Sequence, residues 1–243
     1  MTAVECADTL SGRLRICSRT LLPICDGPNQ AWREYLVLNQ SRVTSPISRN
    51  RLDASSFAEK GYGYVDNFLP IEIHQKMRDT LTSQGAFSLS PAEIARNPWL
   101  EQFPWHFSPD VVGNRKVEEF DEMRIYLVHL LYLSTPTSKW TQLLLGPLLE
   151  RLEDLRQLQR CKANLYPRDS TFFEHEAHAD NNWEDAKGAL YMVNSCNGYT
   201  KLHDGTKIKS VGNRMLFFKP HLEHCSTNTT DAMCRVTINI NYF

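Results

Sequence analysis

The sequence predicts an α+β fold with a mainly β second half, in which an antiparallel sandwich or barrel follows a layer of helices. Two observations support this prediction. After residue 160, short apolar and β-branched runs are separated by turn pairs such as Asn197-Gly198 and Asp204-Gly205. Before that point, apolar residues recur at helical spacing in several stretches. We therefore expect a helical layer over residues 70–160 and a β core over residues 161–243.

The length of 243 residues and the apolar content of 42% suit one large domain. We expect residues 61–243 to form that domain. Residues 1–60 show neither a strand period nor a helix period, so we expect an irregular N-terminal lead-in. The 27 Lys and Arg residues are balanced by 28 Asp and Glu, which leaves no basic field for nucleic acid or for an anionic membrane.

The same composition predicts a cytoplasmic protein. No apolar run reaches the roughly 20 residues of a membrane-spanning helix, and charged residues interrupt the N-terminal stretch where a signal peptide needs an apolar core. Seven cysteines are odd in number and irregular in spacing, without a C-x-x-C pair. We therefore expect free thiols in a reducing compartment, and a partner that is neither nucleic acid nor membrane.

The first half contains five predicted features in chain order. Alternation over residues 62–68 predicts a short strand, and Pro70 then opens a helix over residues 71–83. Residues 88–115 hold several aromatic rings and are predicted to form a loop packed by its own side chains. Apolar residues three and four apart predict a long amphipathic helix over residues 117–133. A further helix is expected over residues 138–155, kinked where Gly146 precedes Pro147.

The second half is predicted to be almost entirely strands. The expected strands are 162–166, 189–193, 198–203, 206–211, 214–218, 222–227 and 233–242. In the last of them, polar residues from Arg235 to Asn241 alternate with Val236, Ile238 and Ile240, so one face is polar and the other apolar. We expect the polar face to line a pocket; the alternative is a solvated face on a half-exposed strand.

The triplet His178-Ala179-Asp180 is the strongest chemical signal. On an extended segment, residues i and i+2 point the same way, so His178 and Asp180 can bind one metal ion together. A triplet of this kind is common by chance and is weak evidence alone. Non-haem iron needs two imidazoles and one carboxylate on one face, with the opposite face open. A second histidine must therefore come from another strand.

Two histidines, His221 and His224, are candidates for that position. Thr229 and Thr230 look like the centre of a hairpin, and folding the chain there sets His224 opposite Arg235 on a shared face. The guanidinium of Arg235 would then lie beside the metal, suited to bind a carboxylate through two hydrogen bonds. This geometry favours His224 and leaves His221 as the weaker candidate.

These residues resemble a known family. The order His178, Asp180, His224, Arg235 is similar to the iron(II)/2-oxoglutarate-dependent oxygenases, whose core is a double-stranded β-helix, or jelly roll. The resemblance covers residues 61–243. Three further segments are similar to the compact prolyl-hydroxylase-like branch found in phage and bacterial genomes: Lys162-Ala163-Asn164-Leu165-Tyr166, Leu190-Tyr191-Met192-Val193-Asn194 and Asn197-Gly198-Tyr199-Thr200.

The resemblance implies a role for each matching residue. Iron(II) would be held by His178, Asp180 and His224, and Arg235 would bind the distal carboxylate of 2-oxoglutarate. We expect Thr237 to add a hydroxyl to that carboxylate, while the resemblance places a further co-substrate contact at Tyr166 or Asn164. Candidate substrate contacts are Asn239 and Trp183, and the alternative for Trp183 is an aromatic cap on the surface.

The implied activity is that of an iron(II)- and 2-oxoglutarate-dependent dioxygenase. Such an enzyme uses O2 to oxidise a C–H bond, most often by hydroxylation, and releases succinate and CO2. We expect a small-molecule substrate such as an amino acid or a natural-product intermediate, with a peptidyl, prolyl-type side chain as the rival. A different class of protein, a non-catalytic cupin-like metal or ligand binder, stays open. The sequence names neither the substrate nor the oligomeric state.

Overall fold

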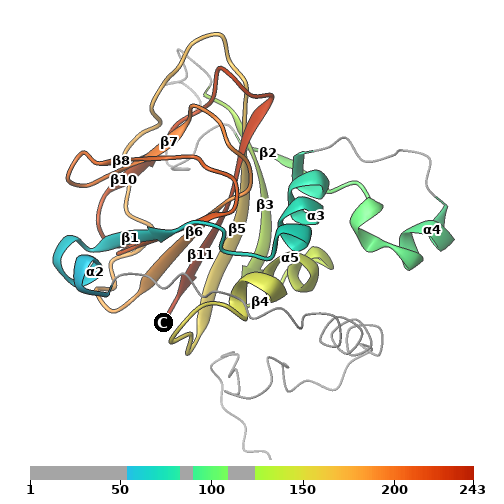
Figure 1. Ribbon diagram of the computed structural model, residues 1–243, viewed down its shortest axis with the longest axis horizontal. Helices are drawn as coiled ribbons and strands as arrows, with labels where there is room; N and C mark the ends of the chain where they lie inside the picture. Colours follow the sequence, from blue (N-terminus) through green and yellow to red (C-terminus); the bar gives the residue numbers. More distant parts are fainter. Residues whose placement is uncertain (1–53, 83–89, 109–123) are drawn as a thin grey trace, which may run out of the picture.

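Figure 1 shows the computed structural model, which describes residues 54–82, 90–108 and 124–243. Most of the predicted lead-in and the first part of the predicted 117–133 helix lie outside the described residues. The last seven residues of the lead-in form a helix, α2 (Ala54–Lys60), rather than an irregular segment. It leads directly into the first strand of the main sheet, because Gly61 reverses the chain with a φ of 78°.

Two antiparallel sheets form the body of the protein (Figure 1). The main sheet has the order β1-β9-β6-β11-β5-β3-β2, with β4 paired to β3, and the minor sheet has the order β10-β7-β8. The main-sheet strands are β1 (Tyr62–Val65), β2 (His106–Ser108), β3 (Tyr126–Leu133), β4 (Thr135–Pro136), β5 (Leu158–Pro167), β6 (Lys187–Met192), β9 (Arg214–Phe218) and β11 (Cys234–Tyr242). Those of the minor sheet are β7 (Tyr199–Leu202), β8 (Lys207–Lys209) and β10 (His224–Ser226).

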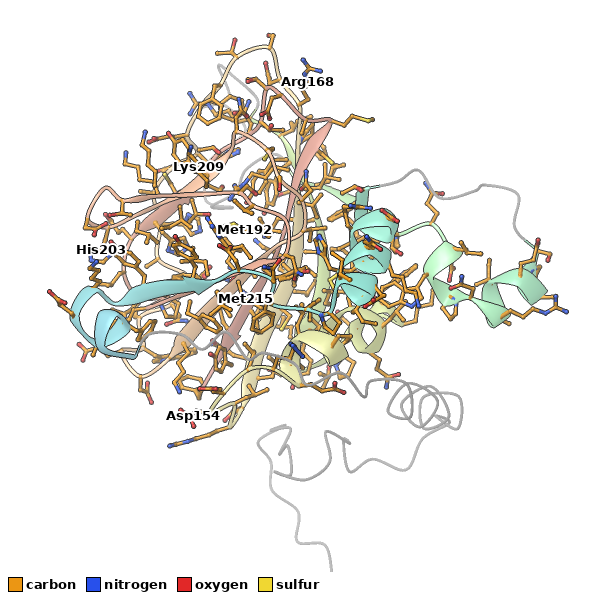
Figure 2. The ribbon with its side chains drawn as sticks, in the orientation of Figure 1. Asp154, Arg168, Met192, His203, Lys209 and Met215 are labelled. Carbon is orange, nitrogen blue, oxygen red and sulfur yellow. The ribbon has the colours of Figure 1, made fainter. Side chains whose placement is uncertain are left out.

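A small apolar cluster fills part of the space between the two sheets. Leu190 and Met192 of β6 pack with Leu202 of β7 and Ile208 of β8, together with residues of β9. Met192 is labelled in the interior in Figure 2. The cluster fixes the minor sheet over one half of the inner face of the main sheet, so this face is inside the sandwich.

Two helices, α3 (Ile71–Thr82) and α5 (Trp140–Leu149), cover the opposite face of the main sheet. The helix α4 (Pro91–Arg96) has no buried residue and leads into the 3-10 turn η1 (Pro98–Leu100), whose Trp99 joins the core. Met77 of α3 and Leu144 of α5 are fully buried and belong to one core cluster with Val236 and Ile238 of β11. This larger core supports the sheet from behind and leaves its inner face free for a site.

The predicted long helix over residues 117–133 is wrong for its described part. Residues Tyr126–Leu133 form β3, which pairs with β2, β4 and β5. The strand carries apolar side chains on both faces, and such a run shows no alternation to distinguish it from a helix. The helical layer predicted over residues 70–160 is therefore smaller than expected, since β2, β3, β4 and the start of β5 lie within it.

The predicted hairpin centred on Thr229 and Thr230 is also wrong. β10 pairs with β7, while β11 lies between β5 and β6 and has both edges occupied. The segment between β10 and β11 crosses from the minor to the main sheet, and hydrogen bonds from Asn197 Nδ2 to Thr230 Oγ1 and from Thr229 Oγ1 to Asn197 Oδ1 hold it. The prediction failed because long-range pairs, not the local turn, determine which strand edges meet.

The alternating pattern of β11 places both of its faces in the interior. Val236 and Ile238 are fully buried against the helices, and Arg235 and Thr237 are 0% and 1% exposed on the inner face. The solvated alternative for the polar face is therefore wrong. A row of polar side chains lies inside the sandwich, which is costly unless those groups find partners.

The predicted loop over residues 88–115 is wrong for its described part, because α4, η1 and β2 lie within it. Most of its aromatic rings belong to the core. Trp99 and Phe103 are buried in the main cluster, and Phe103 contacts Trp105 and Trp140 with ring centroids 4.8 Å and 5.2 Å apart. His129 joins this packing, and its Nδ1 lies 2.7 Å from the carbonyl oxygen of Pro104. These contacts are those of a structural histidine in an aromatic core.

Two further observations concern the expected compartment. In the part of the chain that the structure describes, no helix has both the length and the apolar character needed to cross a membrane. The cysteines within the described ranges, Cys161, Cys196, Cys225 and Cys234, are free thiols. The other three cysteines lie outside those ranges.

Candidate metal centre

Two extended segments bring the three predicted metal ligands together. His178 lies between β5 and β6, and His224 begins β10. Their backbones form an isolated antiparallel bridge, with N–H···O distances of 3.0 Å and 2.9 Å. The amide of Asp180 donates to the carbonyl of Pro220 at 2.8 Å, which continues the contact between the segments. His224 is thus placed by direct pairing with His178, and not by the predicted hairpin.

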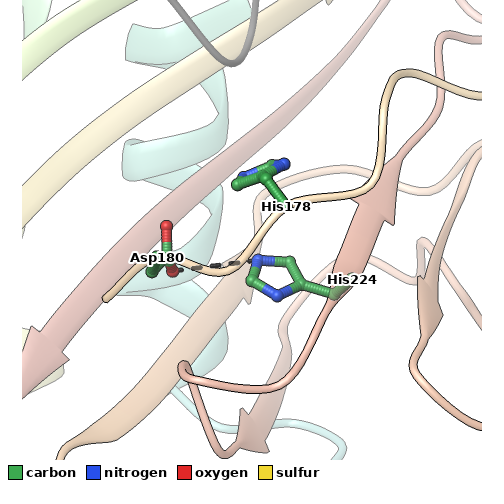
Figure 3. Close-up of side chains that lie close together, drawn as sticks. All are labelled: His178, Asp180 and His224. Atoms are coloured by element: carbon green, nitrogen blue, oxygen red, sulfur yellow. Dashed lines mark ion pairs between the residues drawn. The ribbon is translucent and has the colours of Figure 1, made fainter. Parts of the chain in front are cut away.

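The side chains of His178, Asp180 and His224 offer ligand atoms that all lie within 4.8 Å of one another. Figure 3 shows the three side chains close together, with Nε2 of His224 3.8 Å from Oδ2 of Asp180. Two imidazole nitrogens and one carboxylate oxygen at this spacing are the ligand set of a facial-triad iron site. His221, the weaker candidate, is not part of this cluster.

The orientation of both histidine rings suits metal binding through Nε2. Nδ1 of His178 lies 3.3 Å from the carbonyl of Glu176, and Nδ1 of His224 lies 3.0 Å from that of Leu222. A carbonyl can only accept, so each Nδ1 carries the proton and each Nε2 keeps its lone pair. Burial, followed by the nearby His224, lowers the pKa of His178 and favours this neutral form.

Asp180 is held by two donors from neighbouring strands. Nη2 of Arg160 (β5) donates to Oδ1 at 2.7 Å, and Nδ2 of Asn239 (β11) donates to Oδ2 at 3.0 Å. Burial alone would raise the pKa of this carboxyl group, but His224, Arg160 and Asn239 outweigh it and lower the pKa below its usual value. The side chain is 3% exposed and ionised, with both oxygens oriented before any metal binds.

Arg160 was not among the predicted site residues. The predicted strand started at residue 162, whereas β5 begins at Leu158, so Arg160 lies within the strand. The signal was present as a period of two, because Arg160, Lys162, Asn164 and Tyr166 occupy alternate positions of one face. Asn239, predicted as a substrate contact, donates from Nδ2 to Oδ2 of Asp180.

Arg235 is completely buried on the same inner face. Its Nη1 donates to the carbonyl of Thr227 at 3.1 Å and its Nη2 to Oγ1 of Thr200 at 2.8 Å, while Nε has no partner. Among the residues that the structure describes, no carboxylate forms an ion pair with it. Burial lowers the pKa of Arg235, but a guanidinium stays charged in proteins. The site therefore contains a buried cation without a counter-ion.

A close approach of the backbone makes room for this guanidinium. A Cβ added to Gly198 would lie 2.6 Å from Cδ of Arg235 and 2.7 Å from the carbonyl oxygen of Asn228. Position 198 can therefore hold only glycine without displacing the arginine or the backbone. Gly198 of the predicted Asn197-Gly198 turn therefore has a second role, because its missing side chain leaves space for that of Arg235.

The remaining predicted co-substrate residues lie between Arg235 and the metal ligands. In the β5–β11 register, Tyr166 is opposite Arg235, and Asn164 is opposite Thr237. Directly opposed residues share a face, so all four point into the sandwich. The ring of Tyr166 is 5.4 Å from the Arg235 guanidinium, and Oδ1 of Asn164 is buried without a partner. This strip of polar groups connects Arg235 with the candidate metal position.

Trp183 is on the loop after Asp180 and is separate from this strip. Its side chain is 50% exposed and its ring centroid is 5.7 Å from that of Phe243 at the C-terminus. The contact agrees with the expected alternative of an aromatic surface cap, and the exposed face remains open to a ligand. Trp183 therefore lies apart from the candidate metal ligands and the candidate co-substrate residues.

No protein-family model matches this chain, and no curated protein matches it. Several solved structures do. The carbocyclase SnoK from nogalamycin biosynthesis, described as non-heme and alpha-ketoglutarate dependent, has a TM-score of 0.51 at 12% identity, over 76% of this chain and 80% of that chain. AviO1 from Streptomyces viridochromogenes Tue57 has a TM-score of 0.50 at 13% identity, over 79% and 95%.

A prolyl hydroxylase from Trichoplax adhaerens, solved with a peptide of hypoxia-inducible factor, has a TM-score of 0.49 at 16% identity, over 90% of this chain and 96% of that chain. At such identities, structural likeness establishes the fold alone. The two antiparallel sheets, their order and the similarity to SnoK all agree with the fold that the sequence resemblance implied. This chain has the double-stranded β-helix fold of the iron(II)/2-oxoglutarate-dependent oxygenases.

Proposed function

We propose that the protein is an iron(II)- and 2-oxoglutarate-dependent dioxygenase. It oxidises an unactivated C–H bond of a small molecule, such as an amino acid or a natural-product intermediate, by hydroxylation, and releases succinate and CO2. The observation that carries the proposal is a pairing of two features on one inner face. A three-ligand cluster at one end is accompanied at the other by a buried guanidinium that has no counter-ion among the described residues.

The donor set fits iron(II). His178 and His224 offer Nε2 lone pairs, and Asp180 offers one carboxylate oxygen while Arg160 binds the other. Facial-triad sites leave their remaining coordination positions to the co-substrate and dioxygen. Iron bound there would supply the dioxygen activation and C–H oxidation, and the protein would supply position and orientation.

The surroundings of Arg235 fit the distal carboxylate of 2-oxoglutarate. A buried cation is stabilised when it is paired and hydrogen-bonded, and the planar guanidinium matches a carboxylate in two parallel hydrogen bonds. Nε of Arg235 is free for such a bond. The hydroxyl groups of Tyr166 and Thr237 lie on the same face, where each can donate to a carboxylate oxygen.

The rest of the chain contributes water exclusion and orientation. The apolar cluster between the sheets packs beside the polar strip, and His224 contacts the ring of Phe218 at 4.8 Å. A dry, rigid surrounding strengthens the electrostatic contacts that hold the co-substrate. The co-substrate is thereby held with its keto-acid end toward the metal ligands and its distal end toward Arg235.

The test is anaerobic addition of iron(II) and 2-oxoglutarate to the metal-free protein. We expect a weak metal-to-ligand charge-transfer band in the visible, and succinate release once O2 is admitted. Candidate amino acids and prolyl peptides added to the same assay identify the substrate class through stimulated succinate release. If iron binds but neither the band nor succinate appears, the dioxygenase proposal fails and a non-catalytic metal binder takes its place.

A further inference from the structure

Lys162 of β5 occupies the inner face at the level of the metal ligands. It is opposite Asn239 in the β5–β11 register, and Asn239 donates to the carboxylate of Asp180. Because directly opposed residues share a face, Lys162 also points into the sandwich.

The ammonium group of Lys162 is partly buried and lacks an acidic partner. Nζ donates to the hydroxyl of Tyr126 at 3.3 Å and lies 5.5 Å from the centroid of the same ring. Within the described ranges, no carboxylate forms an ion pair with it. Other lysines have acidic partners, as Lys201 does with Glu174 at 2.8 Å and Lys187 with Asp154 at 3.7 Å. An unpaired cation beside a metal-binding cluster points to an anionic ligand.

Lys162 and Arg235 stand at the two ends of one strip. Arg235 is opposite Tyr166, four residues along β5 from Lys162, which corresponds to roughly 13 Å between backbones at about 3.3 Å per residue. A five-carbon diacid with bonds of about 1.5 Å spans roughly half that distance. Two hydrogen bonds of about 3 Å cover the remainder. The spacing of the two backbone positions therefore fits a short dicarboxylate lying along the strip.

Tyr126 connects the two cationic positions. Its ring is stacked on Tyr166, with centroids 5.6 Å apart and planes 16° from parallel, and Tyr166 in turn faces Arg235. Tyr126 is 4% exposed, so this stack is fixed by packing. The hydroxyl of Tyr126 holds Nζ of Lys162 toward the interior, which reduces the freedom that a long flexible side chain would otherwise lose on binding.

We propose that Lys162 is the second carboxylate anchor of the site and binds the 1-carboxylate of 2-oxoglutarate at the metal end, while Arg235 binds the 5-carboxylate. The inference rests on the proposed function, because it assigns a residue to the same co-substrate. Its consequence is that the co-substrate is oriented by a charge at each end, with the keto group directed to the metal.

Two keto acids distinguish the proposed role of Lys162 from that of Arg235. 2-Oxoglutarate carries both carboxylates, whereas 2-oxopentanoate has the same chain length and keeps only the 1-carboxylate. Each is titrated anaerobically into the iron(II)-loaded protein, and the charge-transfer band reports the apparent Kd. In Lys162→Met we expect both Kd values to rise by the same factor, about 10- to 100-fold, the value of one charge-assisted hydrogen bond. Lys162→Arg should restore most of the affinity.

The matched comparison is Arg235→Met, in which the Kd of 2-oxoglutarate should rise while that of 2-oxopentanoate stays within about threefold. Lys209→Met is the control, because Lys209 is an exposed lysine of β8 on the minor sheet (Figure 2). Thermal unfolding of Lys162→Met verifies that the fold is kept. Should Arg235→Met fail to fold, the equal effect on both ligands in Lys162→Met still decides the question.

Two results would overturn the inference. If Lys162→Met binds both keto acids as wild type does, its ammonium group serves another anion, such as a carboxylate of the substrate. If only 2-oxoglutarate is affected, Lys162 acts at the distal carboxylate. Failure of the wild-type protein to give any band with 2-oxoglutarate has a different meaning, because it contradicts the proposed function itself.

Discussion

The interior of the sandwich has two walls of different chemistry. The polar wall consists of the inward side chains of β5 and β11, which are Arg160, Lys162, Asn164, Tyr166, Arg235, Thr237, Asn239 and Asn241. The apolar wall is contributed by β6, β9 and the minor sheet, and consists of Leu190, Met192, Leu202, Ile208, Leu216 and Phe218. The apolar wall is buried, and the polar wall is buried except at Arg160, Lys162 and Asn239, which are half-buried. The apolar wall gains free energy by burial, whereas the polar wall is stable only with partners.

The two walls are expected to control different properties: the polar wall controls ligand affinity, and the apolar wall controls the stability of the fold. Changes in the polar wall should alter the binding of metal and co-substrate and leave the free energy of unfolding of the ligand-free protein nearly unchanged. Changes in the apolar wall should do the reverse. The metal ligands lie where the walls meet, because His224 contacts Phe218 of one wall and faces Asp180, which is held by Asn239 of the other.

The largest effect is expected at the metal ligands. His224→Ala removes one of three ligands, so iron(II) affinity should fall by more than about 100-fold, beyond the range typical of a residue that only orients a ligand. His221→Ala is the matched control, since His221 lies three positions away and outside the cluster. Iron retention after gel filtration measures both. The reverse order of effects would show that His221 is the ligand.

In the apolar wall, Leu216→Ala should destabilise the protein. Leu216 is fully buried and opposite Leu190 of β6, so the truncation leaves a cavity and costs about 2–5 kcal/mol of unfolding free energy. Chemical denaturation measures the loss. At a temperature where the variant is fully folded, its iron(II) affinity should stay within about threefold of wild type. A much larger loss of affinity would show that the two walls are not separable.

A smaller effect is expected where the polar wall orients a ligand. Asn239→Ala removes one of two donors to Asp180, and loss of such a contact typically weakens metal binding by about tenfold. Asn97→Ala is the control, because Asn97 is an exposed asparagine at the end of α4 and lies outside the polar wall. Competition titration of iron(II) with a chelator compares them. Equal affinities of Asn239→Ala and wild type would contradict an orienting role for Asn239.

Much of the β core could be predicted because its signals are local. Alternation and turn residues gave β9 its observed bounds, Arg214–Phe218, and placed the other strands of residues 161–243 within a few residues. β3 was missed because it is apolar on both faces and shows no period of two. The helix α3 was predicted close to its observed range, Ile71–Thr82, because its apolar residues recur on one side.

The candidate site was predictable in part for the same reason. His178 and Asp180 share a face through a local rule, which needs no knowledge of the fold. His224 was selected by a hairpin that does not exist, and the structure places it instead through a bridge to His178, a contact between residues far apart in the chain. Identifying Arg160 required the true start of β5, and identifying Lys162 required the register that places it opposite Asn239. Their roles in metal and co-substrate binding stay predictions.

The smallest effect is expected outside both walls, at Glu174, where the segment leading to His178 is tied to the minor sheet. Glu174 binds Lys201 and the hydroxyl of Tyr199, and Lys207 lies 3.3 Å away. Lys201 first, then Tyr199, lower the pKa of this carboxyl group to about 2. A lowered pKa gives stability that is complete above the unfolded-state pKa of about 4.3 and is lost as the pH falls toward 2.

Glu174→Gln should therefore destabilise the protein at pH 7, and the difference from wild type should vanish near pH 2, provided that both still unfold cooperatively there. The cluster is partly exposed to solvent, so screening limits the contribution to about 0.5 kcal/mol. Urea denaturation at several pH values between 7 and 2 measures it. A difference that stays constant over this range would show that Glu174 acts through packing and not through its charge.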